Sequence, residues 1–182
     1  METKKDPIIY TQHTIEGLIK KVCLEIRRHH EKLDDIVLIG ILNKGWPLAN
    51  RISNFFKTNH NTQIPVGSLD VTIYRDDLPS RNNFVTLKKT EIPANLTNKK
   101  VILIDDVLFH GRTTRAALNG LMDFGRPKSI ELAVLFDRGD AFRELPIYAR
   151  FLGKKIHLNP EEYINMKFLE IDGEDGIELL IN

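Results

Sequence analysis

Short apolar runs without polar alternation constrain the fold of this chain more than any other feature. Residues 36–41 read Ile-Val-Leu-Ile-Gly-Ile, residues 101–104 read Val-Ile-Leu-Ile, and we interpret residues 130–136 in the same way. A strand that is covered on both faces has no polar side, so it reads as a continuous apolar run. The three runs therefore predict buried strands of a parallel sheet.

The segments between these runs carry helix signals and further strand signals. Apolar residues recur at helical spacing from Ile15 to Ile26, which is typical of an amphipathic helix. The alternation of strands with helices indicates an α/β fold with a mainly parallel sheet. The other expected elements are helices over about 12–31, from about Pro47 and over 114–124, and strands at 66–74, near Phe151 and at 177–181.

Composition narrows the class of protein. A chain of 182 residues with 42% hydrophobic residues fits one globular domain with a full core. We find no apolar run near the roughly 20 residues that a membrane span needs, and no signal-type stretch at the start. The single cysteine, Cys23, lies in the apolar pattern of a helix and is expected in the core. These features favour a cytoplasmic location, and the net charge of +1 does not by itself demand a nucleic-acid partner.

The segment from Val101 to Thr113 carries the chemistry. It begins as a buried strand, reaches two adjacent acids, Asp105 and Asp106, and then crosses a short loop to a helix. In open α/β sheets, ligands bind outside the carboxyl ends of the strands. Carboxylates there accept hydrogen bonds from vicinal hydroxyls, so a ribose is a suitable ligand for the pair.

The loop from Phe109 to Thr113 supplies the second half of this prediction. It leads into a helix N-terminus, where free N–H groups favour an anion, and Gly111 permits a close backbone approach. A phosphate beside two ribose hydroxyls describes a ribose 5-phosphate. The alternative is that the two acids only cap the next helix. The segment is neither a Walker loop nor a G-x-G-x-x-G fingerprint.

The 101–113 segment resembles the binding motif for 5-phosphoribosyl 1-pyrophosphate (PRPP) in type I phosphoribosyltransferases. From about Ile8 onward, the chain is similar to the pyrimidine operon regulator/uracil phosphoribosyltransferase family. The resemblance implies a type I phosphoribosyltransferase fold over residues 1–182, a central and mostly parallel sheet flanked by helices. It also implies a flexible loop at about 75–90, and a small hood from about 137–182 with the N-terminal segment. The matching stretches are residues 70–78, 101–113, 125–127, 137–139 and 143–147.

The resemblance also assigns site residues. Catalytic roles fall on Asp105, Asp106 and Arg75, with Arg75 contacting the departing pyrophosphate unless it only pairs with Asp76 or Asp77. A cis peptide bond is expected at Leu42–Asn43 in the pyrophosphate loop. Lys44 in this loop is expected to bind pyrophosphate, and the alternative is a solvated surface lysine. Arg138 is expected to help bind the base, and the alternative is that it is only a structural ion-pair partner. The expected PRPP-binding residues are Asp105, Asp106, Val107, Leu108, Phe109, His110, Gly111, Arg112 and Thr113, the pyrophosphate-binding residues are Asn43, Lys44 and Gly45, and the base-binding residues are Asp137 and Arg138.

The implied reaction displaces pyrophosphate from PRPP by a ring nitrogen of a nucleobase. Magnesium is expected to be held mainly through the substrate oxygens and water, with no protein ligand set of its own. Enzymes for 6-oxopurines typically carry an acid where this chain has Phe109, which favours uracil, giving UMP, over a purine. His110, a hood that is two residues longer around Phe142, and Arg150 depart from the family pattern near the substrate. A purine phosphoribosyltransferase is a further alternative.

The family resemblance also implies RNA-binding attenuation of pyrimidine genes. The helix positions that contact RNA in the family fall on Lys20 and Leu24, and Leu24 has no group that donates to RNA. The enzyme is therefore favoured over specific messenger RNA binding. A weakly active nucleotide sensor is a third reading. By resemblance alone, we expect a homo-oligomer, a dimer or larger.

Overall fold

The computed structural model describes residues 10–76, 89–93 and 95–181. Its main sheet has five strands, which are parallel at every pairing. All six residues of the strand Ile36–Ile41 are buried, as expected for a strand that is covered on both faces. In spatial order the strands are β3 (Val66–Leu69), β2 (Ile36–Ile41), β4 (Lys100–Leu108), β5 (Ser129–Asp137) and β6 (Phe151–Lys155).

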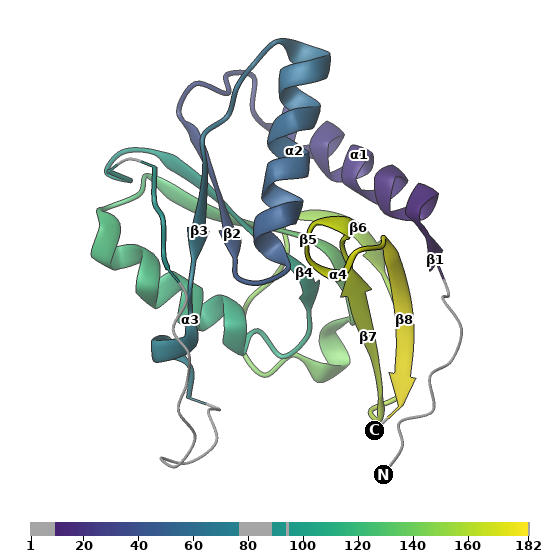
Figure 1. The fold of residues 1–182 in the computed structure, drawn as a ribbon. Helices are drawn as coiled ribbons and strands as arrows, with labels where there is room; N and C mark the ends of the chain where they lie inside the picture. The colour runs from purple at the N-terminus through teal and green to yellow at the C-terminus, as the bar shows by residue number, and fades with distance from the viewer. Residues whose placement is uncertain (1–9, 77–88, 94, 182) are drawn as a thin grey trace.

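Helices cover both faces of this sheet (Figure 1). On one face, α1 (Gln12–His29) and α2 (Gly45–His60) pack in one hydrophobic cluster with the sheet. On the other face, α3 (Arg112–Leu121) contributes Ala116, Ala117 and Leu121 to a second cluster. The α/β fold of the type I phosphoribosyltransferases, predicted from the apolar runs and the resemblance, is confirmed.

A smaller antiparallel sheet lies beside the main one (Figure 1). Its strands are β1 (Tyr10–Thr11), β8 (Gly176–Ile181) and β7 (Glu162–Lys167), in that order, and α4 (Leu169–Asp172) connects the last two. Arg51 of α2 ties this unit to the helical layer. Its guanidinium donates to the carboxylates of Glu170 (2.5 and 2.8 Å) and Asp175 (2.7 and 2.9 Å).

Most predicted elements are present, with shifted ends. The helix expected to 31 ends at His29, the helix expected from about Pro47 begins at Gly45, and the helix expected over 114–124 begins at Arg112. It continues from Met122 to Phe124 as a 3-10 turn, and Gly125 follows with φ of 129°. Cys23 is buried, as expected, and burial raises the pKa of its thiol to about 12.

The strand predicted over 66–74 is wrong in its second half. β3 ends at Leu69, and a 3-10 turn (Thr72–Tyr74) follows. Asp70 explains the break, because its Oδ1 accepts hydrogen bonds from the backbone N–H (2.9 Å) and the hydroxyl (2.5 Å) of Thr72. Such a side-chain turn competes with continued strand pairing.

Two further differences concern chain segments that sequence analysis left open. β1, β7 and α4 were not predicted, since none of them carries a continuous apolar run or a full helical period. Most of the loop expected at about 75–90 lies outside the described residues. Among the described helices, none is both long and apolar enough to cross a membrane.

Candidate active site

The strand order creates a crevice at the carboxyl ends of β2 and β4. From β2 the chain moves to β3 on one side, whereas β4, β5 and β6 follow on the other side. Ligands bind at such a reversal of strand order. Gly45, just after β2, lets its loop lie against β4, because a Cβ there would be only 2.1 Å from the carbonyl oxygen of Ile104. The expected cis peptide bond at Leu42–Asn43 is present in this loop.

The two acids of β4 lie inside the strand rather than just after it. The strand was expected to end before Asp105, but its pairing with β5 continues to Leu108 opposite Asp137. Asp105 Oδ1 accepts the backbone N–H of Asp106 (3.0 Å), and Asp106 Oδ1 accepts that of Val107 (2.9 Å). Both side chains are half-buried at the rim of the crevice.

Burial and proximity act strongly on this pair. Burial raises the pKa of Asp105 well above its ordinary value, and the charge of Asp106 raises it further, while the charge of Arg75 opposes the shift. Burial also raises the pKa of Asp106, against hydrogen bonds from Asp105 and the backbone and the charge of Lys44. Two half-buried carboxylates with raised pKa values at a crevice are characteristic of a functional site.

A cavity of about 160 Å³ opens beside Asp105, and Asp106 is not among its lining residues. The first turn of α3 forms one wall, and the first N–H groups of a helix have no intrahelical partner. Gly111 caps this helix with φ of 92°, a left-handed conformation that suits glycine. The lining residues are Arg75, Asp105, Val107, Leu108, Phe109, His110, Gly111, Arg112, Thr113 and Thr114.

The cavity therefore gathers most of the predicted PRPP-binding residues with Arg75, which comes from a separate segment. The carboxylate of Asp76 pairs with Arg112 (3.1 Å) and Arg115 (3.2 Å), and Asp77, the other acid expected near Arg75, lies outside the described residues. Arg115 was not predicted at the site. It also donates to the backbone oxygen of Tyr74 (3.2 Å) and so fixes the segment that carries Arg75.

Lys44, in the loop after β2, lies near enough to Asp106 for its charge to act on that acid. Its Nζ is 2.5 Å from Oδ2 of Asp172 at the end of α4, and its side chain is 22% exposed. It is thus an ion-paired lysine rather than a freely solvated one. Asp172 also accepts the backbone N–H of Phe168 (2.7 Å), so the smaller sheet orients the loop after β2. Sequence analysis missed this acid, which lies 128 positions from its partner.

The loop after β5 is fastened to the phosphate-loop segment from behind. Arg143 donates to Asp137 Oδ1 (2.6 Å) and to the backbone oxygen of Phe109, and its side chain is almost fully buried. Asp137 Oδ1 also accepts the backbone N–H of Gly139 (2.8 Å). Asp137 is therefore fully engaged within the protein and does not line the cavity. Arg143 is a site-supporting residue that sequence analysis did not single out.

Arg138 and two aromatic rings form a layer behind the same loop. The guanidinium carbon of Arg138 lies 3.6 Å from the ring centre of Phe109 and 5.1 Å from that of Phe142. Arg138 is 3% exposed and donates to the backbone oxygen of Asn159 (3.1 Å). Phe142, from the longer hood loop, packs 5.5 Å from Phe109. The two predicted base-binding residues thus support the loop and do not line the described cavity.

His110 extends this stack toward solvent. Its ring lies 3.6 Å from that of Phe109, centre to centre, at an interplanar angle of 29°. Its Nε2 is 3.9 Å from Glu144, which also accepts from Arg112 (2.6 Å). The bulky imidazole is accommodated on the cavity wall by the hood loop.

Comparison with known proteins identifies the family of this arrangement. The sequence matches the phosphoribosyl transferase domain over residues 8–165. It is 44% identical to the bifunctional protein PyrR of Chloroflexus aurantiacus over 172 residues, covering 94% of this chain and 93% of that protein. The PyrR protein of Thermus aquaticus is 45% identical over 159 residues, 87% of each chain. The chain belongs to the phosphoribosyltransferase family, in its PyrR branch.

Solved structures of other phosphoribosyltransferases share the fold. A hypoxanthine-guanine phosphoribosyltransferase from Bacillus anthracis superposes with a TM-score of 0.71, 19% identity and coverage of 99% of this chain and 100% of that one. A hypoxanthine phosphoribosyltransferase from Staphylococcus aureus gives 0.69 and 21%, over 98% of this chain and 92% of that one. At such identity the likeness concerns the architecture alone, so it does not indicate a purine substrate.

Proposed function

We propose that this phosphoribosyltransferase transfers the ribose 5-phosphate of PRPP to uracil, giving UMP and pyrophosphate. The observation that carries the proposal is the cavity in which Asp105, Arg75 and the first turn of α3 converge. A 5′-phosphate fits the N-terminus of α3, and the ribose hydroxyls fit the carboxylate acceptors on the preceding strand, β4. The loop of Asn43, Lys44 and Gly45 lies against the end of β4 in the same crevice, where it is placed to bind the pyrophosphate.

Each group has a distinct part in this proposal. Asp105 and Asp106 accept the ribose hydroxyls and hold C1′ of the sugar at the mouth of the crevice. Residues 109–113 bind the 5′-phosphate through backbone N–H groups and the hydroxyl of Thr113. Catalysis then rests on positioning and on charges fixed in advance, because a ring nitrogen of the base displaces pyrophosphate directly.

The cations around the crevice serve the leaving group. Arg75 stabilises the charge that develops on pyrophosphate as the bond to C1′ breaks. Lys44 offers a second positive charge, already oriented by Asp172 at 2.5 Å, and Asn43 and Gly45 contribute backbone N–H groups. A lysine presents a point charge rather than the bidentate fork of an arginine, so we expect looser pyrophosphate binding than an arginine would give.

Magnesium fits the donor set of this crevice as a substrate-borne ion. Two carboxylates with raised pKa values and nearby cations make a poor cage for a bare divalent ion, whereas Mg²⁺ keeps most of its waters and binds phosphate oxygens readily. When bound with PRPP, it neutralises charge on the pyrophosphate. Asp105 and Asp106 then orient the sugar rather than holding the metal.

Uracil is the proposed base because the phosphate loop has no acid to handle a purine ring proton. Phe109 stands at that position, stacked between His110 and Arg138. We propose that the loop from Asp137 to Glu144, together with the smaller sheet, forms the hood over the base. Asp137 and Arg138 then act on the base through the backbone of that loop, which they hold in place.

The curated relatives are named bifunctional, so RNA binding is the second candidate. In this chain Leu24, on the outer face of α1, is 40% exposed at the position where the family resemblance expects an RNA-contacting histidine. An exposed leucine offers no donor to a base or a phosphate. We therefore propose that the enzyme activity is the primary role, in a cytoplasmic homo-oligomer.

The test is pyrophosphate release from PRPP and Mg²⁺ with uracil, hypoxanthine, guanine, xanthine, adenine and orotate in turn. Selective turnover with uracil is expected. Turnover with a purine would overturn the assignment of the base and leave the PRPP site standing. No turnover with any base, in a protein that binds PRPP or UMP, would replace the enzyme by a nucleotide sensor. Salt-dependent binding to pyrimidine-operon leader RNA would then favour the regulator.

A further inference from the structure

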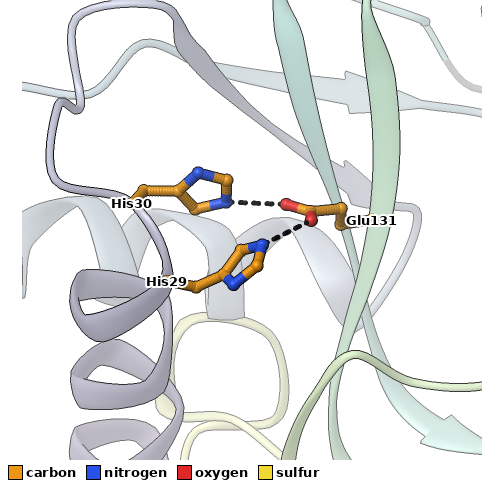
Figure 2. Close-up of side chains that lie close together, drawn as sticks. All are labelled: His29, His30 and Glu131. Atoms are coloured by element: carbon orange, nitrogen blue, oxygen red, sulfur yellow. Dashed lines mark hydrogen bonds and ion pairs between the residues drawn. The ribbon is translucent and has the colours of Figure 1, made fainter.

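A cluster of metal-ligand side chains lies at the opposite end of the main sheet from the cavity. His29 ends α1, His30 follows it, and Glu131 is the third residue of β5. Figure 2 shows both imidazoles pointing at one carboxylate. His30 Nε2 is 2.6 Å from Oε2 of Glu131, and His29 Nε2 is 3.2 Å from Oε1.

We propose that His29, His30 and Glu131 form a binding site for a divalent transition-metal ion of the zinc type. One ligand atom from each side chain lies within 4.8 Å of the others. Two imidazoles and one carboxylate form a donor set that zinc accepts, with a fourth position open to water. No step of the proposed transferase reaction uses this site.

The geometry needs only small adjustments. Zinc binds nitrogen and oxygen ligands at about 2.0–2.2 Å, so two tetrahedral ligand atoms lie about 3.3 Å apart. The 3.2 Å separation of His29 from Oε1 of Glu131 is already of this size. The 2.6 Å separation of His30 from Oε2 must widen, so the carboxylate turns slightly if it binds the ion through one oxygen. The two rings are edge to face at 81°, so their nitrogens approach one point from different directions.

The burial of the three ligands is graded as a metal site requires. The side chain of His30 is 4% exposed, that of Glu131 is 14% exposed and that of His29 is 38% exposed. A groove of about 610 Å³, lined in part by His29 and Arg150, opens at the exposed side. An ion therefore has a route in, and its fourth position has access to water.

Arg150 is the cation that now faces the cluster. Its Nε is 3.2 Å from Glu131 Oε1, and its guanidinium nitrogens lie 2.9–3.2 Å from the ring nitrogens of His29. Its side chain is half exposed, so it is free to swing into the groove when a metal ion takes its place. Lys100 adds further positive charge that acts on His30. Both cations weaken metal binding, so removal of one of them is expected to tighten it.

The site is separate from the one proposed for PRPP. Glu131 pairs with Ile102, which lies three residues before Asp105 on β4, or roughly 10 Å along the strand, and the cavity extends from Asp105 toward α3. The donor sets also differ, because imidazole suits zinc, copper and nickel, whereas Mg²⁺ prefers oxygen ligands. Zinc binding is thus measurable in protein without PRPP, and its outcome is independent of the transferase activity.

The experiment is zinc titration of the tag-free, metal-stripped full chain by calorimetry, with melting temperature as a second readout. One zinc per chain and a higher melting temperature are expected, and Mg²⁺ should do neither. His29→Asn and Glu131→Gln should each weaken zinc binding at least tenfold. His13→Asn is the matched control, because it removes an almost fully exposed imidazole at the other end of α1.

Arg150→Gln separates a metal site from an ion-pair cluster. Removal of the competing cation should tighten zinc binding about tenfold, and the substitution replaces none of the three proposed ligand residues. Unchanged or weaker binding in this variant would overturn the proposal, as would equal losses in His29→Asn and His13→Asn. Failure of the parent chain to bind zinc would also overturn it, even if Arg150→Gln binds. His30 is left intact throughout, because its burial makes a folding defect the expected result of replacing it.

Discussion

Carboxylates lie at both ends of the main sheet, Asp105 and Asp106 toward the carboxyl end of β4 and Glu131 near the amino end of β5. Glu131 is surrounded by partners, since two histidines and Arg150 contact its two oxygens at 2.6–3.2 Å. The side chains of Asp105 and Asp106 instead accept hydrogen bonds from the backbone of their own strand.

The difference shows what each end is built for. At the amino end, the acid is neutralised inside the protein and ties α1 to the sheet. At the carboxyl end, burial raises the pKa values of both acids, and the charge of Asp106 raises that of Asp105 further, so the folded protein carries a cost there that a ligand relieves. Stability and function are thus expected to respond in opposite directions to the removal of these charges.

The largest effect is expected from the paired replacement Asp105→Asn with Asp106→Asn. Each lost charge-assisted hydrogen bond to a ribose hydroxyl costs about 1.5–3 kcal/mol, so PRPP affinity should fall roughly 10²- to 10⁴-fold. The melting temperature should stay the same or rise. Calorimetric titration with PRPP and a melting curve measure both; PRPP binding at the parent affinity in the folded variant would contradict the assignment.

Sequence analysis located the main sheet because its inner strands are buried on both faces and so read as apolar runs. β7 escaped, since its residues Glu162–Lys167 are mostly half-buried and mix polar with apolar side chains. The acids of β4 and the glycine after β2 were identifiable from local pattern. The pairs Lys44–Asp172 and Asp137–Arg143 were not, because each depends on how distant loops fold together. The catalytic and binding roles stay predictions.

Arg75→Gln should produce the next largest effect, and it separates the role of this cation from that of the two acids at the carboxyl end of the sheet. If Arg75 stabilises the departing pyrophosphate, kcat should fall about 10²- to 10³-fold, with a smaller change in KM. Steady-state kinetics with uracil and PRPP provide the measurement. Asp76→Asn is the control, because it removes a neighbouring charge that pairs with Arg112 and Arg115. An equal loss in both variants would point to a collapsed loop instead of a catalytic cation.

Glu131→Gln tests the amino end. In this variant Arg150 and the two histidines lose the carboxylate that they contact. The free energy of unfolding should therefore fall by about 1–3 kcal/mol. Turnover with uracil should not change, since the residue does not line the cavity. Urea denaturation and steady-state kinetics measure the two quantities. A stable variant with impaired turnover would reverse the roles assigned to the two ends.

The smallest effect expected is the pH dependence of stability in Asp105→Asn. A carboxyl whose pKa is higher in the folded than in the unfolded protein contributes stability that is fully present below its unfolded pKa of about 3.9 and is lost as pH rises through the folded pKa. Asparagine does not ionise, so the variant should match the parent near pH 4 and become more stable than it as pH rises.

The gain at neutral pH should be about 1 kcal/mol, or roughly 2–4 °C in melting temperature for a chain of this size.

Glu170 should show the opposite dependence of stability on pH within the same protein. Its hydrogen bond with Arg51 lowers its pKa, so the stability it contributes is present above its unfolded pKa and lost as pH falls. Glu170→Gln should therefore be less stable than the parent at neutral pH and approach it in acid. If the melting temperatures of the two variants, each relative to the parent, change with pH in the same direction, the charge of Asp105 does not destabilise the folded protein.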